Sequence, residues 1–222
     1  CQVRGVEEAT LARIIRRATE LGAVSIGLDA VFAPRPESPG LDELRRAIKE
    51  SGKVVLAASY EPAQPGVRER TTETPPCCGL AKLARAQGLV HVHRDVGDLL
   101  YAMNHVYQEP GITTRYSLPL ELAAWHAGAG GRRAETELRS DAVVLKPANG
   151  LVYRIPFDSG GRSLVPYAGP AGTIPSIPWR ELLGDKAPSL AAKTVILGSA
   201  RTDIKDSYAT PFHRDQRGTI SG

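Results

Sequence analysis

The chain has 222 residues, 42% hydrophobic and 23% charged, and its 28 Lys and Arg against 24 Asp and Glu give a formal net charge of +4. This much apolar material can offset the entropy of ordering the chain, which excludes a disordered protein. No apolar run reaches the roughly 18 residues that cross a bilayer. Charges of both signs are interspersed, as in residues 42–46, so we expect no nucleic-acid partner.

The first third of the chain predicts a helix, a strand, a helix and a strand in that order. Leu11, Ile14 and Leu21 recur at helical spacing, so we expect an amphipathic helix over 7–21. In chain order the next elements are a strand over 24–29, a helix over 41–51 and an apolar strand over 53–58. This alternation favours parallel pairing through a right-handed crossover.

Shorter elements are predicted downstream. Residues 61–78 include four prolines and predict a long surface loop. The elements expected after it are a helix over 80–87, a hairpin of strands 89–93 and 99–107, a helix over 118–126, strands over 142–145, 151–155 and 163–167, a helix over 178–183 and a buried strand over 194–198. No linker or repeat divides them, so we expect one α/β domain over residues 1–222, with a mixed central sheet and flanking helices.

Both ends of the chain indicate a portion of a longer protein. It opens with Cys1 rather than Met, carries no signal peptide and stops in polar sequence at Gly222. We therefore expect a domain truncated at both ends.

The glycine-rich and metal-type motifs do not form a catalytic pattern. Residues 128–131 follow a predicted helix rather than a strand, which excludes a dinucleotide-binding turn, and residues 158–162 favour a hairpin turn. His91 and His93 share one strand face and Asp95 would be a third metal ligand, although two ordinary sheet histidines are the favoured interpretation. We expect no metal, no cofactor and no catalytic residue in this chain.

The chain has three cysteines, so at least one is unpaired within a monomer. Cys77 and Cys78 are adjacent, and adjacent cysteines rarely bond to each other because of strain. Two interpretations stay open. One is an unligated structural or surface role, and the other is a bridge from Cys1 to one of the pair in an oxidising compartment.

Polar residues that follow two predicted strands are the candidate ligand-binding residues. Asp29 ends a buried strand, where α/β sheets place ligand contacts, although it would equally cap the next loop. Arg201, Asp206 and Thr210 follow the last strand. These three either hold their segment to the core through hydrogen bonds or, with Lys205, line a pocket for a small anionic solute.

Four segments, in a fixed order, resemble the CHASE2 domain family. They are GAVSIGLDAVF at 22–32, GKVVLA at 52–57, AQGLVHV at 86–92 with SLPLELA at 117–123, and AGTIP at 171–175 with KTVILG at 193–198 and DSYATP at 206–211. The first is similar to the family pattern GA-x-x-IGFD-x-x-F. The arginine that usually closes the family's hairpin is absent, since residues 95–101 are DVGDLLY.

The resemblance implies a periplasmic or extracellular sensor domain of a bacterial receptor, held by transmembrane helices of the same polypeptide. Its stimulus would be an unidentified small molecule or ion. Its cytoplasmic effector, a nucleotide cyclase, histidine kinase or Ser/Thr kinase, would lie outside this chain, and a homodimer is a further arrangement that it allows. In an oxidising periplasm, a bridge from Cys1 to Cys77 or Cys78 gains support.

Two alternatives belong to other functional classes. One is an α/β hydrolase that uses Asp29, Asp206 and a histidine such as His213, which would have to converge in one cleft. The other is a structural module that dimerises the receptor through a buried apolar interface.

Overall fold

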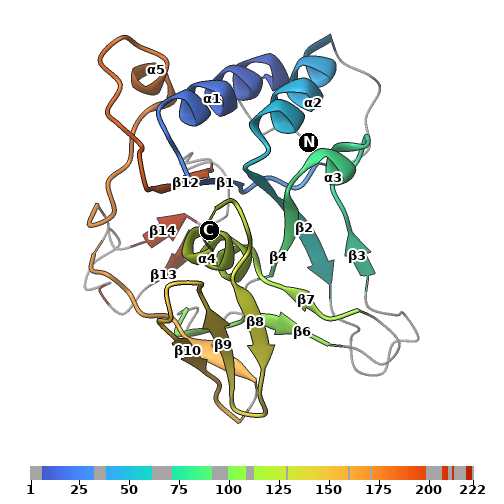
Figure 1. The fold of residues 1–222 in the computed structure, drawn as a ribbon, viewed down its shortest axis with the longest axis vertical. Coiled ribbons are helices and arrows are strands. Elements are labelled where there is room, and N and C mark those ends of the chain that lie inside the picture. The colour runs from blue at the N-terminus through green and yellow to red at the C-terminus, as the bar shows by residue number, and fades with distance from the viewer. Residues whose placement is uncertain are drawn as a thin grey trace.

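The central sheet lies between helices on its two faces (Figure 1). The computed structural model describes residues 7–32, 39–61, 72–91, 100–108, 113–128, 130–159, 161–170, 172–198, 207–209, 212 and 219–221. Helices α1 (Glu8–Glu20) and α2 (Pro39–Ser51) cover one face, and α4 (Leu118–Ala127) covers the other. The predicted mixed central sheet with flanking helices is confirmed.

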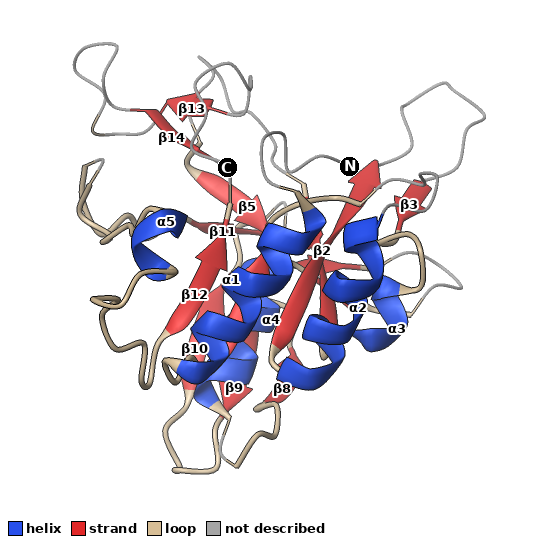
Figure 2. Ribbon diagram, turned by 90° about the horizontal axis from the view of Figure 1, so that it is seen from above, coloured by secondary structure: helices blue, strands red, loops and turns tan. Residues whose placement is uncertain are grey.

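Four parallel strands form the main part of this sheet. They are β12 (Thr194–Leu197), β1 (Ser25–Leu28), β2 (Val54–Glu61) and β4 (Ala86–Val90), in that spatial order. A short fifth strand, β3 (Thr72–Thr74), pairs antiparallel with β2. The predicted parallel pairing of the first two strands is therefore confirmed. In Figure 2, β12 and β2 point toward the part of the molecule that carries β13 and β14.

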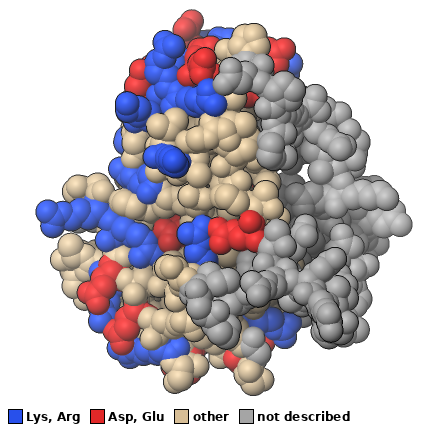
Figure 3. Space-filling view, turned by 90° about the vertical axis from the view of Figure 1, so that its right-hand side faces the viewer, with Lys and Arg blue, Asp and Glu red and all other residues tan. Residues whose placement is uncertain are grey.

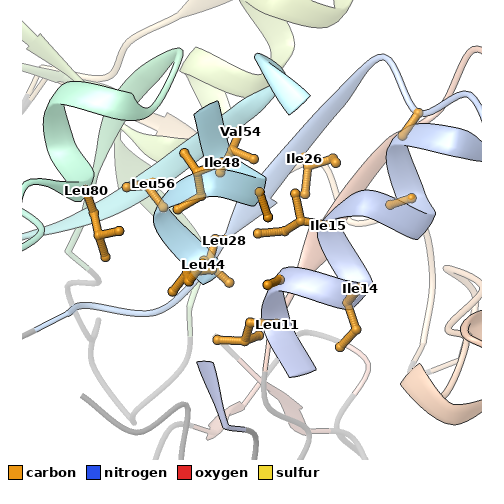
Figure 4. Close-up of a cluster of buried hydrophobic side chains, with 14 of the residues drawn as sticks. Leu11, Ile14, Ile15, Ile26, Leu28, Leu44, Ile48, Val54, Leu56 and Leu80 are labelled. Carbon is orange, nitrogen blue, oxygen red and sulfur yellow. The ribbon is translucent and has the colours of Figure 1, made fainter. Parts of the chain in front are cut away.

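The main core fills the space between α1, α2 and the sheet (Figure 4). The helices contribute apolar side chains from one stripe each, as the periodicity predicts. The largest fully buried side chains here are Ile15, Leu44 and Ile48 from the helices and Ile26, Leu28, Val54 and Leu56 from the strands. Burial of this kind contributes about 25 cal/mol per Å² of apolar surface, so this layer is the main source of stability.

Helix α4 is buried on two sides. Leu118 and Leu122 pack against the central sheet, whereas Leu120 and Ala124 pack against Val143 and neighbouring side chains of a second sheet. That sheet comprises β8 (Glu135–Leu138), β9 (Ala142–Lys146) and β10 (Tyr153–Pro156), all antiparallel. A helix between two apolar surfaces must be apolar all round, which explains the absence of a polar stripe in its sequence.

A close approach between α4 and β4 requires glycine at position 88. A Cβ atom added to Gly88 would lie 2.3 Å from the Cα atom of Leu118. That distance is far below van der Waals contact, so only a residue without a side chain lets the helix backbone rest on the strand here.

The other elements are short and lie around this core. They are α3 (Leu80–Leu83), β5 (Ala102–Asn104) paired with β11 (Arg162–Leu164), β6 (Val106–Tyr107) paired with β7 (Arg115–Tyr116), α5 (Trp179–Leu182), and β13 (Ser207–Ala209) paired with β14 (Thr219–Ser221). The predicted short helix near 178–183 corresponds to α5.

The predicted hairpin of residues 89–93 and 99–107 is wrong. Strand β4 pairs parallel with β2, and the second segment is divided into β5 and β6, which pair with other partners. The physical reason is burial: Leu89 is 2% exposed and lies beside Ala58 of β2, so the apolar run belongs in the central sheet. The helix expected over 80–87 is likewise shorter, because β4 begins at Ala86.

Three further expectations change in the structure. The strand near 194–198 is an edge strand rather than a buried one, because β12 pairs with β1 alone among the described strands and Ile196 is 62% exposed. Most of the proline-rich segment 61–78 lies outside the described residues, but its end contains β3. The turn at 158–162 joins strands of two different sheets, so it is a turn but not a hairpin.

Candidate functional site

The carboxyl ends of β1 and β12 bring Asp29 next to Gly198. These strands pair in register, with Leu28 opposite Leu197, and the Asp29 amide donates to the Leu197 carbonyl oxygen at 2.9 Å. A Cβ atom added to Gly198 would lie 4.0 Å from Oδ2 of Asp29. The half-buried Asp29 carboxylate therefore lies beside the backbone from which the next segment departs.

The strand order reverses at this point of the sheet. From β1 the chain passes through α2 to β2 on one side, whereas β12 flanks β1 on the other side. In open α/β sheets, ligands bind outside the carboxyl ends of the strands where the order reverses. Asp29 directly follows β1 at this position of the sheet.

The remaining predicted site residues cannot be placed beside Asp29. Arg201, Asp206 and Thr210 lie outside the described residues, as do Lys205 and the alternative histidine, His213. What the structure places is the start of their segment at Gly198.

The residues of the alternative metal interpretation also fall partly outside the described residues. His91 is half-buried just after β4, whereas His93 and Asp95 are not described. Within the part of the chain that the structure describes, no three His, Cys, Asp or Glu residues form a group that would hold a metal ion.

The adjacent cysteines lie in the turn that leads from β3 into α3. The Cys77 amide donates to the Phe32 carbonyl oxygen at 2.9 Å, and the Cys78 carbonyl oxygen accepts from Nε of Arg45 at 2.9 Å. Burial, followed by the Cys78 thiol, raises the pKa of Cys77 to about 11. The thiol is therefore protonated at neutral pH and a poor nucleophile. Cys1 lies outside the described residues, so the Cys1 bridge stays a prediction.

Polar contacts at the start of α4 were not anticipated from the sequence. Ser117 caps the helix by accepting from the Leu120 amide at 3.2 Å, and Oγ of Ser117 lies 2.8 Å from Nδ1 of His105. Burial lowers the pKa of His105, so the imidazole is neutral at pH 7. Ser117 followed by Pro119 in the first turn is a signal that could have identified the cap.

A buried ion pair joins α4 to the segment that leads into β8. Both carboxylate oxygens of Glu121 accept from Arg133, each at 2.9 Å, and the Glu121 side chain is only 8% exposed. Arg133 also donates to Thr136 Oγ1 at 2.6 Å. This bidentate geometry fixes the position of α4 against the second sheet.

One hydrogen-bonded chain of hydroxyl and imidazole groups superficially resembles a catalytic arrangement. Oγ of Ser25 lies 3.0 Å from Oγ1 of Thr194, which lies 3.1 Å from Nδ1 of His126. Ser25 is fully buried, and no carboxylate among the described residues orients His126. Among the described residues, this hydrogen-bonded series therefore has no carboxylate that would complete a triad.

Charges of both signs lie side by side on the face shown in Figure 3. Among the described helices, none is both long and apolar enough to cross a membrane.

A model of the CHASE2 domain family matches residues 5–222. No curated protein and no solved structure matches the chain in the corresponding searches. CHASE2 domains are extracytoplasmic sensor modules of signal transduction and are themselves non-catalytic, and two residues of the hydrolase alternative, Asp206 and His213, lie outside the described residues. Because the match covers nearly the whole chain, this protein belongs to the CHASE2 domain family.

Proposed function

We propose that this CHASE2 domain recognises a small-molecule or ionic stimulus at the carboxyl edge of its central sheet. Asp29, Arg201, Asp206 and Thr210 are the proposed ligand-binding residues. The observation that carries the proposal is the parallel register of β1 and β12, which places Asp29 beside Gly198, where the segment with the other three begins.

The chemistry of these residues suits a small polar ligand. The guanidinium is a cationic donor, the two carboxylates are anionic acceptors, and the hydroxyl is a neutral group that can donate and accept. Charge-assisted hydrogen bonds from such groups are about twice as strong as neutral ones, so few contacts are needed for specificity.

Signalling requires that the ligand bind two conformations of the domain with different affinity. A tenfold difference in affinity corresponds to about 1.4 kcal/mol, which one or two charged hydrogen bonds supply. The output would pass through membrane-spanning segments of the same polypeptide to a cytoplasmic cyclase or kinase, and the domain would sit on the periplasmic or extracellular side.

A thermal-shift screen of metabolites and ions against this domain tests the proposal. A ligand at a hundred times its Kd stabilises the native state by about 2.7 kcal/mol, which appears as a higher Tm. Asp29→Asn should abolish the shift, whereas Asp185→Asn, at an exposed loop position, should retain it.

Two results would count against this site. A hit that stabilises the Asp29→Asn variant as strongly as the native domain would place the ligand elsewhere. A null screen together with a concentration-dependent dimer in sedimentation would favour the structural dimerisation module.

A further inference from the structure

The opposite, amino-terminal edge of the central sheet is lined by cations. Lys53, Arg85 and Lys193 directly precede β2, β4 and β12, and parallel pairing places all three at the same edge. Nζ of Lys53 donates to the Ala23 carbonyl oxygen at 2.7 Å, in the connection between α1 and β1. Lys193 is exposed, whereas Arg85 is half-buried.

Arg85 differs from the other half-buried arginines. Within the described residues, Arg85 forms no ion pair or hydrogen bond through its guanidinium, although burial lowers its pKa. The other half-buried arginines of the described residues each pair with a carboxylate; they are Arg16, Arg17, Arg45, Arg115, Arg133 and Arg162. A half-buried guanidinium keeps five N–H donors, and those of Arg85 stay available to a ligand that supplies acceptor oxygens.

Among the described residues, the immediate surroundings of Arg85 supply a second donor and no acidic partner. Its guanidinium carbon lies 4.6 Å from the ring centroid of Trp125, and Nε1 of that indole is buried without an acceptor among the described residues. Glu121, one turn earlier on α4, is held by Arg133. A Cβ atom added to Gly131 would lie 3.9 Å from Nη2 of Arg85, so the turn at this glycine borders the guanidinium.

We propose that Arg85, stacked on Trp125, forms a second binding site that takes an oxyanion, namely the carboxylate, phosphate or sulfate group of a solute. Two oxygens of such a group accept hydrogen bonds from one guanidinium. They would give the Arg85 donors an acceptor, which the described residues do not supply. The site lies at the opposite end of the strands from Asp29, so it does not depend on the proposed stimulus site.

Tryptophan fluorescence tests the site directly, because the chain has only two tryptophans. The Trp179→Phe variant leaves Trp125 as the sole reporter. Titrations with sodium phosphate, sulfate and acetate, each at ionic strength matched with sodium chloride, should give a saturable change for at least one oxyanion. The ranking of the three distinguishes a phosphate-type from a carboxylate-type ligand.

Calorimetry with the preferred oxyanion then assigns the binding to Arg85. Arg85→Gln should raise the Kd at least about tenfold, because the bidentate charge-assisted contact is lost. Arg180→Gln is the matched control, since Arg180 stacks on the other tryptophan at 4.5 Å on the exposed surface, and its Kd should match the native value.

Three results would overturn the proposal: no saturable change in the Trp179→Phe titration, a response equal to that of sodium chloride, or an unchanged Kd in Arg85→Gln. The first two results come from the Trp179→Phe variant, which keeps Arg85. They therefore test the proposal even if the Arg85→Gln variant does not fold. None of them bears on the Asp29→Asn result.

Discussion

The two faces of the central sheet are built in different ways. The α1/α2 face is closed almost entirely by aliphatic side chains, whereas the α4 face combines aliphatic packing with buried polar contacts. Apolar burial is non-directional and supplies free energy, while hydrogen-bonded pairs demand one geometry. The comparison indicates that apolar packing on the α1/α2 face supplies free energy of folding, whereas the polar pairs on the α4 face fix the position of α4.

The polar contacts of α4 bind it to three different neighbours. Ser117 and His105 hold its start, Glu121 and Arg133 hold its middle, and Trp125 stacks with Arg85 near its end. Burial lowers the pKa of His105, and the proposed oxyanion site contains Arg85. We therefore expect the α4 face to respond to solution conditions and the α1/α2 face to respond to volume changes.

The largest effect is expected on the α1/α2 face. Leu44 is fully buried between α2 and the sheet, so Leu44→Ala should lower the free energy of unfolding by about 2–5 kcal/mol through lost burial and a residual cavity. Urea denaturation measures this. Leu164→Ala, at a 75% exposed position, should change it by less than about 0.5 kcal/mol. Equal losses in the two variants would contradict the assignment of the main core.

A smaller but substantial effect is expected on the α4 face. Glu121→Gln removes the charge that Arg133 binds and should cost about 2–3 kcal/mol, because Arg133 is left half-buried without its carboxylate. The control is Glu137→Gln, which breaks solvent-exposed ion pairs with Arg139 and Lys146 and should cost much less stability, because water screens such pairs. Chemical denaturation of both variants decides whether the buried pair specifies the position of α4.

The smallest effect is a dependence on acid. The folded chain resists protonation of His105, whose pKa burial lowers, whereas the unfolded chain takes up that proton near pH 6.5. The free energy of unfolding should therefore fall as the pH drops below about 6.5, by at most about 1.4 kcal/mol per pH unit.

Thermal unfolding between pH 7.5 and 5 measures this dependence. His105→Gln should flatten the profile in that range, because the neutral amide has no proton to gain. A profile that keeps its slope in His105→Gln would assign the acid response to other groups.

Local sequence patterns were sufficient for some elements and for one residue of the candidate site. Amphipathic spacing identified α1 and α2, and the helix–strand alternation identified the parallel pairing of β1 with β2. Asp29 could be named because a polar residue directly follows an apolar strand. The ordered motifs indicated the family, which the family match confirms.

Sequence by itself thus determined what local patterns encode, namely the longer helices, the first two parallel strands, the family and the polar end of β1. Only the tertiary structure decided that β4 pairs with β2, that Asp29 meets Gly198, and that Arg85 stacks on Trp125. The reason is that hydrophobic periodicity reports which side of a segment is buried, not against what. Which distant segments pair with each other is decided by how the helices on both faces pack against the central sheet.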